Sequence, residues 1–404
     1  MILDFLSCFF VFGKEIRMKF KANRKIMLEH LKSMYKVVPK STTVQELGGF
    51  LIEANENDGY VYMTANNLEA AVQRKFKAEI ETAGACIIEA KMLISMLALL
   101  KGDDVSFDET KKGITEIKSG NCTYTIKVLD AKIYPRPEMP FPEDTVKITG
   151  LKQMYQKTSS TVAKGEASKS LVGIHVDVKD NSVRAVGCDS RGLALCAKDM
   201  KCGGDLSFTL HKNVFSYLAN AAGDDELEVG KCGPYIIFMK DGMLFSAKPL
   251  MYEYVNVDVM LNSIKRDYLA KVEFDEFKDI VSYIADIANM GSETSYIKFE
   301  FIDDAINIST ANDVGNGSTT MPAVVVESSG NKEYYYTAGM LKDIFKTVEG
   351  TILLQLDKRG YMMVFDKYNK YMLTPIRDIS VQKQAEKFAA KKKPKKAKPE
   401  SKAA

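Results

Sequence analysis

Two short acidic motifs are the first residues in this 404-residue chain that suggest chemistry. Gly102-Asp103-Asp104 and Gly223-Asp224-Asp225 each place two adjacent carboxylates after a glycine. Carboxylates are the side chains that hold Mg²⁺ and that serve as general acids and bases, so a metal-dependent enzyme built from both loops is one hypothesis. The competing hypothesis is that both motifs are solvated turns that mark an architectural unit used more than once.

Other residues that commonly carry catalysis are sparse. The three histidines, His30, His175 and His211, are isolated from one another, and each pattern favours a surface or half-buried imidazole. The sequence contains no serine nucleophile elbow, no Gly-x-x-x-x-Gly-Lys loop and no His-x-x-x-His pair. Residues 315–320, GNGSTT, match a phosphate loop in composition alone, and we interpret them as a hairpin connection. We therefore expect no catalytic residues, no metal ligands and no cofactor.

Cysteine usage and hydropathy bound the cellular setting. Seven cysteines are an odd number, and none forms a Cys-x-x-Cys pair, so neither a disulfide framework nor a zinc ribbon is indicated. No apolar run approaches the roughly 20 residues of a membrane span. These features predict a protein of the reducing cytoplasm without a membrane partner.

The net charge of +3 is a sum of unlike parts. The segment after Ser380 carries nine lysines against two glutamates, a charge of +7, so residues 1–380 carry −4. A slightly acidic body can still present a basic face, and net charge alone neither supports nor excludes a nucleic-acid partner. The composition of 381–404 predicts a disordered tail, and residues 1–17, a poor signal peptide, are expected to be a non-structural extension.

The residues around the acidic motifs occur in three related copies. Residues 86–100, 206–222 and 332–349 each contain a β-type run followed by an apolar helix, and a glycine stands near each helix end. A strand and a hairpin follow in every copy. The third copy has Glu349-Gly350-Thr351 in place of Gly-Asp-Asp. Because a metal site would not be expected to lose its carboxylates in one of three equivalent positions, the turn hypothesis is favoured.

The first half of each copy repeats as well, which defines three modules. Amphipathic helices are predicted at 23–38, 147–163 and 274–290, and two strands follow each. Residues 130–145 hold four of the eleven prolines and suit an extended linker, and a weaker link runs through 253–268. The predicted class is α+β, with three domains at 18–141, 142–266 and 267–380, followed by the tail 381–404.

The polar faces of the first two helices are mostly basic. Exposed lysines at spacings of three and four residues form a positive face that suits DNA phosphates, although an ordinary solvated face is the alternative. The exposed face of the third helix is acidic instead, with Asp275, Asp279 and Asp286. The residues predicted to face DNA are Arg24, Lys25, Lys32, Lys36, Lys40, Lys152, Lys164 and Lys169.

Five segments in order make the chain similar to a known family. They are the opening MKF at 18–20, MTANNLEAAV at 63–72, DAKIYP at 130–135, GCDSRGLALC at 187–196 and YMLTPIR at 371–377. Together with the threefold module, they resemble the bacterial-type DNA sliding clamp, the β subunit of the DNA polymerase III holoenzyme. The resemblance covers essentially all of 18–377.

This resemblance implies three tandem clamp domains, each with two helices on an inner face and β-sheets on an outer face. Two chains would close head to tail as a homodimeric ring around double-stranded DNA, without sequence specificity. The implied function is a processivity factor, an accessory subunit of a DNA-directed DNA polymerase without a catalytic site, in the cytoplasm at the nucleoid. A divergent clamp-fold scaffold of a phage or mobile element that does not encircle DNA is the alternative.

The resemblance also implies an apolar cleft for short peptides of the polymerase, the clamp loader and repair proteins. Departures from the family pattern, Arg191-Gly192 and YVNV at 254–257, imply an altered peptide preference. A further departure is the 27 residues that follow Arg377. Carried across by position, the cleft residues are Leu171, Cys188, Leu193, Val255, Met260, Met372, Pro375, Ile376 and Arg377.

Overall fold

The computed structural model describes residues 17–377, except 166–168, 180, 292–294 and 368. The predicted extension 1–17 therefore lies outside the described residues except for Arg17, and the predicted tail 381–404 lies outside them entirely. The described residues form two compact units. Unit 1 lies within Met1–Tyr155, Gly173–Val183 and Asp199–Tyr252, and unit 2 within Gln156–Val172, Arg184–Lys198 and Glu253–Ala404.

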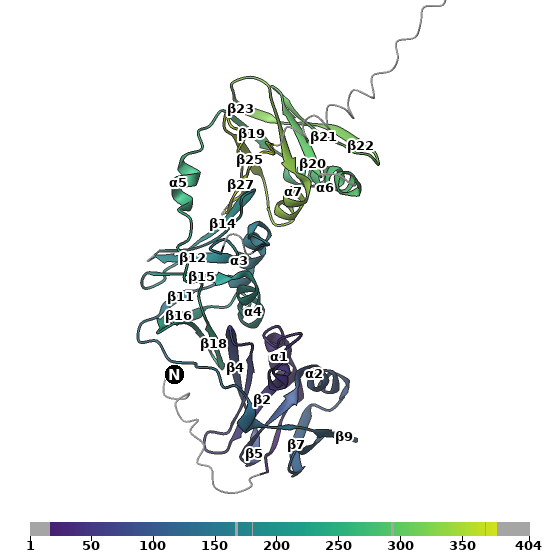
Figure 1. Ribbon diagram of the computed structural model, residues 1–404, viewed down its shortest axis with the longest axis vertical. Coiled ribbons are helices and arrows are strands. Elements are labelled where there is room, and N and C mark those ends of the chain that lie inside the picture. The colour runs from purple at the N-terminus through teal and green to yellow at the C-terminus, as the bar shows by residue number, and fades with distance from the viewer. Residues whose placement is uncertain (1–16, 166–168, 180, 292–294, 368, 378–404) are drawn as a thin grey trace, which may run out of the picture. The chain divides into compact units, whose positions relative to one another are not determined.

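Unit 1 contains two antiparallel sheets, a strand pair and four helices (Figure 1). One sheet has the order β5-β1-β7-β8-β9, the other β10-β6-β2-β3-β4-β18-β17-β16-β11, and β12 pairs with β15. Its strands are β1 (Lys19–Asn23), β2 (Gly49–Asn55), β3 (Tyr60–Asn66), β4 (Ala70–Lys77), β5 (Glu79–Thr82), β6 (Gly84–Glu89), β7 (Asp104–Lys111), β8 (Ile114–Ser119), β9 (Cys122–Lys127), β10 (Leu129–Asp130), β11 (Val146–Ile148), β12 (Gly173–Lys179), β15 (Leu206–His211), β16 (Leu227–Cys232), β17 (Tyr235–Lys240) and β18 (Met243–Ala247). Its helices are α1 (Arg24–Met34), α2 (Ala90–Leu99), most of α3 (Leu151–Thr158) and α4 (Lys212–Ala222).

Unit 2 contains a long sheet and a four-stranded sheet that pack against two main helices. The long sheet runs β13-β14-β27-β26-β25-β19-β23 and the other β22-β21-β20-β24. The strands are β13 (Ser182–Cys188), β14 (Gly192–Asp199), β19 (Tyr268–Val272), β20 (Tyr296–Phe301), β21 (Ala305–Ala311), β22 (Asn316–Pro322), β23 (Val324–Ser328), β24 (Lys332–Thr337), β25 (Ile352–Leu356), β26 (Met362–Phe365) and β27 (Asn369–Leu373). The helices are α5 (Val257–Asn262), α6 (Phe274–Met290) and α7 (Ala338–Phe345).

The same element order recurs three times along the chain, as the sequence predicts. Between a first helix (α1, α3, α6) and a second helix (α2, α4, α7) the structure has four or five strands where the sequence predicts three, and each second helix precedes a strand and a hairpin. Within unit 1, α1 lies beside α2, and within unit 2, α6 lies beside α7 (Figure 1). The domain boundaries at 141 and 266 are not the boundaries of the two compact units, and they stay a prediction.

Local capping explains where several helices begin. The Asn23 side chain accepts a hydrogen bond from the Ile26 amide at 3.1 Å, and Glu273 accepts one from the Glu276 amide at 2.9 Å. Such side chains satisfy amides that have no partner inside the helix. The helix α4 ends at Gly223, whose φ of +68° suits glycine and few other residues.

The second amphipathic helix is shorter than predicted. The segment predicted at 147–163 divides into β11, the helix α3 and a 3-10 turn at Ser159–Thr161. The run Thr158 to Val162 is rich in hydroxyl and β-branched residues, which favour such turns over helix. Thr161 Oγ1 donates to the Thr158 and Gly187 carbonyls at 2.9 Å, so the side chain fixes the turn against β13.

Three smaller expectations also need correction. The first helix, predicted to continue to residue 38 and to bury Tyr35, ends at Met34, and Tyr35 is 41% exposed. Most of GNGSTT is strand β22, and the connection before it is a turn in which the Asn312 carboxamide accepts from the Val314 and Gly315 amides. The weaker link at 253–268 contains the short helix α5.

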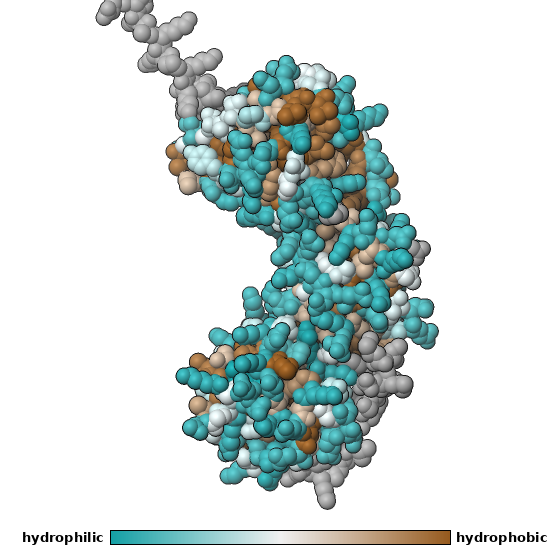
Figure 2. All heavy atoms as spheres, turned by 180° about the vertical axis from the view of Figure 1, so that it is seen from behind, coloured by the Kyte–Doolittle hydropathy of each residue, from teal (hydrophilic) through white to brown (hydrophobic). Residues whose placement is uncertain are grey.

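Large aromatic side chains fill the core of unit 2. Phe277 of α6 lies 4.9 Å, between ring centroids, from Phe345 of α7 and packs on Phe299 of β20. All three side chains are fully buried, so α6 and α7 are fixed to the four-stranded sheet. The face of the molecule seen in Figure 2 is mostly hydrophilic, with apolar residues gathered near the top of the view. No helix among the described residues is long and apolar enough to cross a membrane.

Candidate binding surfaces: basic helices and an apolar cluster

The acidic motifs make the contacts of turn and capping residues. Asp103 lies 3.2 Å from the Lys25 ammonium, and Asp104 lies 2.9 Å from that of Lys21. Asp224 accepts a hydrogen bond from the Gln153 amide in the first turn of α3 at 2.9 Å, and Asp225 pairs with Lys240. Over the described part of the chain, no three histidine, cysteine or acidic side chains form a group that could hold a metal ion. These geometries favour the turn hypothesis for both motifs.

The structure leaves four of the predicted DNA-facing residues of module 1 exposed in unit 1. Lys25 and Lys32 lie on α1, and Lys36 and Lys40 follow its end. The Lys25 side chain is 71% exposed although it pairs with Asp103, so the ion pair is a solvated one with little net energy. These four lysines are available to an anionic partner.

Arg24 is the remaining predicted DNA-facing residue of module 1, and its environment differs from that of the four lysines. Its guanidinium donates to the Gly102 carbonyl at 2.6 Å and to the Leu97 carbonyl at 2.8 Å, and the residue is half-buried. Carbonyls at a helix C-terminus carry partial negative charge and lack partners inside the helix. Arg24 therefore ties the end of α2 to the start of α1, a role that residue spacing alone did not reveal.

The basic residues of the second module are divided between the two units. Lys152 is exposed on α3 in unit 1, whereas Lys164 and Lys169 are exposed in unit 2. Lys157, which the sequence places near the same basic face, has a side chain that is only 4% exposed. Its ammonium donates to the Thr347 carbonyl after α7 and lies 3.2 Å from the Glu349 carboxylate. The acidic residues of α6, Asp275, Asp279 and Asp286, are exposed.

Six of the nine predicted cleft residues belong to one apolar cluster in unit 2, here called the cleft cluster. Cys188, Leu193 and Met372 belong to its buried part, with at most 5% of each residue exposed. Burial raises the pKa of the Cys188 thiol to about 12, which keeps it neutral and apolar in character. Half-buried residues border this floor: Leu171, Val255 and Met260, with Tyr254, Leu261, Tyr361 and Phe365.

Strand pairing and the α5 segment position the cleft cluster. Leu193 of β14 lies opposite Met372 of β27 in antiparallel register. The Tyr254 hydroxyl donates to the Val186 carbonyl at 3.3 Å, which holds the segment before α5 against β13. The methionines are flexible and the apolar border residues are half-buried, so this surface can repack around an apolar ligand.

The last three predicted cleft residues are placed differently. Ile376 packs beside Tyr296 and Tyr335, outside the cleft cluster, and its amide donates to the Tyr335 carbonyl at 2.7 Å. Pro375, which precedes Ile376, is half-buried. The exposed Arg377 reaches the cleft cluster through Tyr361, whose hydroxyl lies 3.3 Å from its guanidinium.

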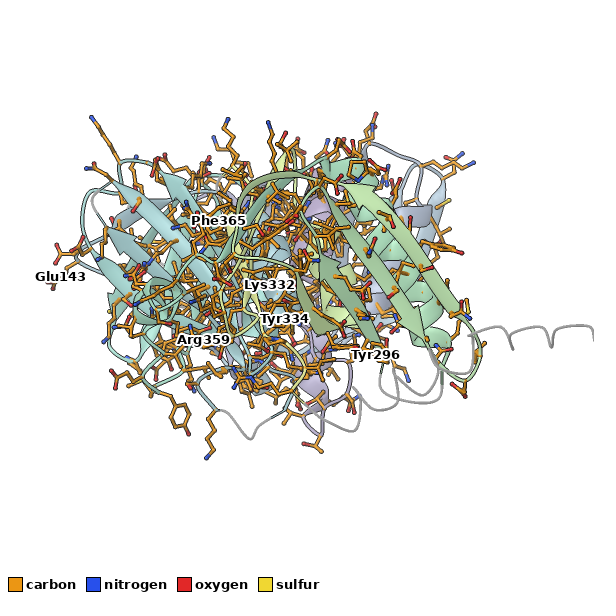
Figure 3. All side chains as sticks on the ribbon, turned by 90° about the horizontal axis from the view of Figure 1, so that it is seen from above. Glu143, Tyr296, Lys332, Tyr334, Arg359 and Phe365 are labelled. Carbon is orange, nitrogen blue, oxygen red and sulfur yellow. The ribbon has the colours of Figure 1, made fainter. Side chains whose placement is uncertain are left out.

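Sequence reasoning missed the aromatic border of this cluster. Tyr361 and Phe365 flank the apolar run of β26, and their spacing is that of residues on one face of a strand. That alternation predicts that the two side chains lie on the same face of the strand, but it does not show which face is exposed. Figure 3 shows Phe365 and Arg359 among the side chains seen from above.

Comparison with known proteins agrees with this architecture. A family model described as DNA polymerase III beta subunit, N-terminal domain, matches residues 18–140. The beta sliding clamp of Chlamydia muridarum is 23% identical over 325 residues, covering 75% of this chain and 83% of the relative. That of Bacillus subtilis is 21% identical over 372 residues, covering 89% and 90%.

Solved structures show the same fold over most of the chain. The DNA polymerase III beta subunit of Thermotoga maritima superposes with a TM-score of 0.81 at 19% identity, covering 89% of this chain and all of that one. A Pseudomonas aeruginosa sliding clamp bound to griselimycin gives 0.80 at 18% identity, with the same coverage. The chain thus has the three-domain sliding-clamp fold. Residues 18–140 match the N-terminal-domain model of the DNA polymerase III beta-subunit family, and the comparisons agree with the resemblance to a bacterial-type sliding clamp seen in the sequence.

The environment of Arg24 leads to a stability prediction. Arg24→Gln removes charge-assisted hydrogen bonds to two carbonyls, and we expect the free energy of unfolding to fall by about 1–2 kcal/mol. Lys25→Gln is the matched control, since its solvated ion pair is expected to contribute less than about 0.5 kcal/mol. Urea denaturation followed by circular dichroism measures both variants, and equal effects of the two would contradict the distinction.

Proposed function

We propose that this chain is a DNA polymerase processivity factor, a ring-shaped clamp that tethers the replicative polymerase to duplex DNA. The observation that carries the proposal is the threefold module in the sliding-clamp fold, with a family N-terminal domain at residues 18–140. On this proposal the chain is an accessory subunit without a catalytic site of its own, and it acts in the cytoplasm at the nucleoid.

The pairing of sheets between modules supports ring closure by a second copy. In unit 1, the third strand of module 1, β4, pairs with the last strand of module 2, β18. In unit 2, the third strand of module 2, β14, pairs with the last strand of module 3, β27. By the same rule, β22 of module 3 would pair with β9 of module 1. Each is an edge strand of its sheet, so we propose that they pair between two chains, head to tail.

Helix contacts follow the same rule. The first helix α1 packs on the second helix α4 in unit 1, where Asn220 donates to the Ser33 carbonyl at 2.8 Å. In unit 2, the end of the α3 segment packs on α7 through Lys157. The remaining pair is α6 and α2. Apolar side chains stand exposed on both, namely Tyr283 and Met290 on α6 and Leu99 on α2, each at least 64% exposed, as expected of surfaces that a second chain covers.

The exposed lysines supply the contact with DNA on this proposal. A closed ring stays on DNA because of its topology, so its lysines need only weak, exchangeable phosphate contacts that permit sliding. Lys25, Lys32, Lys36 and Lys40 in unit 1 and Lys152, Lys164 and Lys169 along the second module are the candidates. Arg24 contributes its charge to this region while its guanidinium holds α2.

The cleft cluster is the proposed docking site for short peptides of the polymerase, the clamp loader and repair proteins. Its half-buried border and methionine content suit an extended peptide with apolar anchors. Leu171, Val255 and Met260 form the border, with Cys188, Leu193 and Met372 beneath. Pro375, Ile376 and Arg377 extend the site toward the end of the described chain.

A clamp-fold scaffold that does not encircle DNA is the second candidate. The exposed acidic residues of α6 favour it, since they would repel phosphates wherever the helix faced DNA. The two candidates share the fold and the peptide cleft, and they differ in DNA retention.

The exposed lysines lead to a prediction about DNA retention. Replacing Lys25, Lys32 and Lys36 together with glutamate reverses three charges, and we expect retention on nicked circular DNA to fall by about tenfold or more at moderate salt. Gel filtration of clamp loaded onto DNA measures retention. The control replaces the exposed Lys77, Lys111 and Lys112 with glutamate, the same charge change elsewhere. Normal retention of the first variant would count against the basic lining.

The cleft cluster leads to a prediction about peptide affinity. Changing Leu171 and Met372 together to alanine removes apolar contacts at the border and the floor, and we expect the host polymerase's clamp-binding peptide to bind at least about tenfold more weakly. Fluorescence polarisation measures the affinity, and the urea midpoint checks folding. Met251→Ala with Leu353→Ala is the control, since both residues are exposed outside the cleft cluster. Unchanged affinity in the double variant would remove this site.

A further inference from the structure

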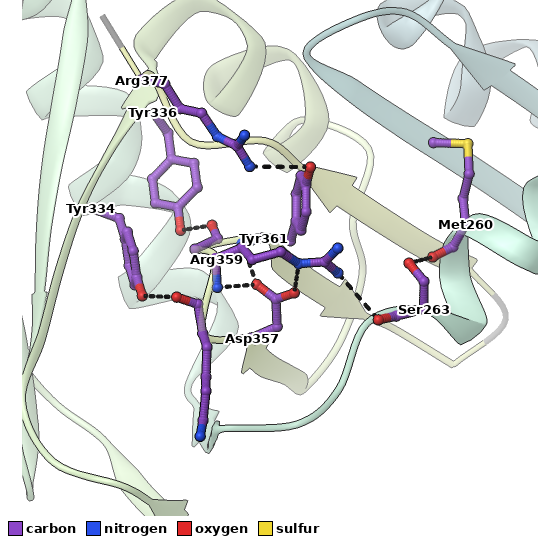
Figure 4. A network of polar contacts seen from close by, with 10 residues as sticks. Met260, Ser263, Tyr334, Tyr336, Asp357, Arg359, Tyr361 and Arg377 are labelled. Carbon is purple, nitrogen blue, oxygen red and sulfur yellow. Dashed lines mark hydrogen bonds and ion pairs between the residues drawn. The ribbon is translucent and has the colours of Figure 1, made fainter. Parts of the chain in front are cut away.

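The turn between β25 and β26, residues 357–361, places two guanidinium groups beside the cleft cluster. Figure 4 shows Tyr361 with Arg359 and Arg377 close to its ring. The Arg359 guanidinium carbon lies 4.6 Å from the centroid of that ring, and the Arg377 carbon lies 5.7 Å from it. Because Tyr361 belongs to the cleft cluster, the two cations stand at the border of the apolar surface.

The turn that carries Arg359 is rigid. The buried Asp357 carboxylate accepts hydrogen bonds from the amides of Arg359 at 2.8 Å and Tyr361 at 3.0 Å. The Tyr336 hydroxyl donates to the Gly360 carbonyl at 2.7 Å, and Gly360 has a φ of +85°, which favours glycine. A fixed turn presents its side chains without an ordering cost when a ligand binds.

Arg359 also joins this turn to the α5 segment. Its Nε donates to Asp357 at 2.7 Å, and its Nη2 donates to the Ser263 carbonyl at 3.1 Å. The Ser263 hydroxyl donates to the carbonyl of Met260, a border residue of the cleft cluster. A guanidinium has five N–H groups, so these two bonds hold the side chain and leave donors for a ligand.

The charges at this border do not cancel. Asp357 is the carboxylate that contacts Arg359, and its side chain is 4% exposed, so it offsets Arg359 from beneath. The described contacts of the Arg377 guanidinium are the Tyr361 hydroxyl and ring. The exposed Lys358 lies in the same turn and adds a further positive charge. The border of the cleft is therefore electropositive where it meets the apolar surface.

We infer that Arg359 and Arg377, held against Tyr361, form a carboxylate subsite that selects cleft ligands with an aspartate or glutamate next to their apolar anchors. The inference rests on the proposed peptide-docking function and names its specificity. Planar guanidinium groups bind carboxylates with two parallel hydrogen bonds, and a partly desolvated border strengthens such pairs. An acidic peptide fits better than DNA here, because the subsite is continuous with an apolar surface that phosphates would not occupy.

The test compares three labelled peptides that differ at one position. Each carries the same leucine and phenylalanine anchors and an amidated C-terminus, with Glu, Gln or Lys beside the anchors. Fluorescence polarisation is expected to show the Glu peptide binding wild-type protein about fivefold or more tightly than the Gln peptide, with the Lys peptide weakest and the spread reduced by salt. The amidated terminus ensures that the side chain is the carboxylate measured.

Two variants separate the subsite from the cleft. Arg359→Gln and Arg377→Gln are each expected to reduce the Glu-to-Gln preference to less than about twofold. Arg377 is exposed, so its variant tests the subsite without risk to the turn. Arg266→Gln, at an exposed arginine that pairs with Glu327 instead, is the control and is expected to keep the full preference.

The outcomes distinguish the two proposals. Equal binding of the Glu and Gln peptides to wild-type protein, with Met372→Ala weakening both, would overturn the carboxylate subsite and leave the cleft in place. If none of the peptides bound, the cleft and its subsite would both be overturned. Competition by duplex DNA against the Glu peptide, lost in Arg377→Gln, would reassign the subsite to phosphate.

Discussion

Backbone pairing between the edge strands of successive modules is the constraint on which this structure depends. A sheet edge exposes a row of unpaired N–H and C=O groups, and a protein must cover it, pair it or make it unattractive. The pairs β4–β18 in unit 1 and β14–β27 in unit 2 each join two modules by antiparallel hydrogen bonding. The third strand of module 3, β22, and the last strand of module 1, β9, remain at the ends of their sheets. On the proposed function, another copy of the chain supplies the strand that each of these edges lacks.

Cations at helix ends accompany this pairing. Carbonyls at or just after the end of the second helix in each module receive a cation from another element: Arg24 at α2, Arg74 at α4 and Lys157 after α7. Arg74 and Lys157 are both less than 9% exposed. A buried cation is costly unless it is paired, and helix C-termini offer the partial negative charge that it requires. Positive charge in this protein therefore serves packing as well as any DNA contact.

Sequence periodicity predicted the recurring elements well where one face is apolar and the other polar. The helix α6 spans the residues predicted for it. Two of the three hairpins predicted to follow the second helices turn at Gly120 and Gly242, both glycines with positive φ. Prediction failed where local side-chain bonding competes with helix, as at Thr161. The roles of Arg24 and Lys157 were hidden for a different reason, since both depend on which distant carbonyl lies within reach.

The candidate cleft shows a similar division. Resemblance to a family identified six residues that the fold gathers into one cluster, because strand register carries position faithfully over long distances. The same procedure missed Tyr361 and Arg359, since the geometry of the turn that carries them depends on local hydrogen bonds to Asp357 and Gly360. The architecture is readable from sequence here, whereas these local contacts are not.

The mass of the chain in solution tests this account most directly. Sedimentation equilibrium at micromolar concentration should give about twice the 45.1 kDa of one chain, because the proposed ring pairs β22 of one copy with β9 of the other. A single species at the mass of one chain, unchanged as concentration rises, would mean that these edges stay unpaired. The head-to-tail ring, and with it the encircling of DNA, would then be wrong.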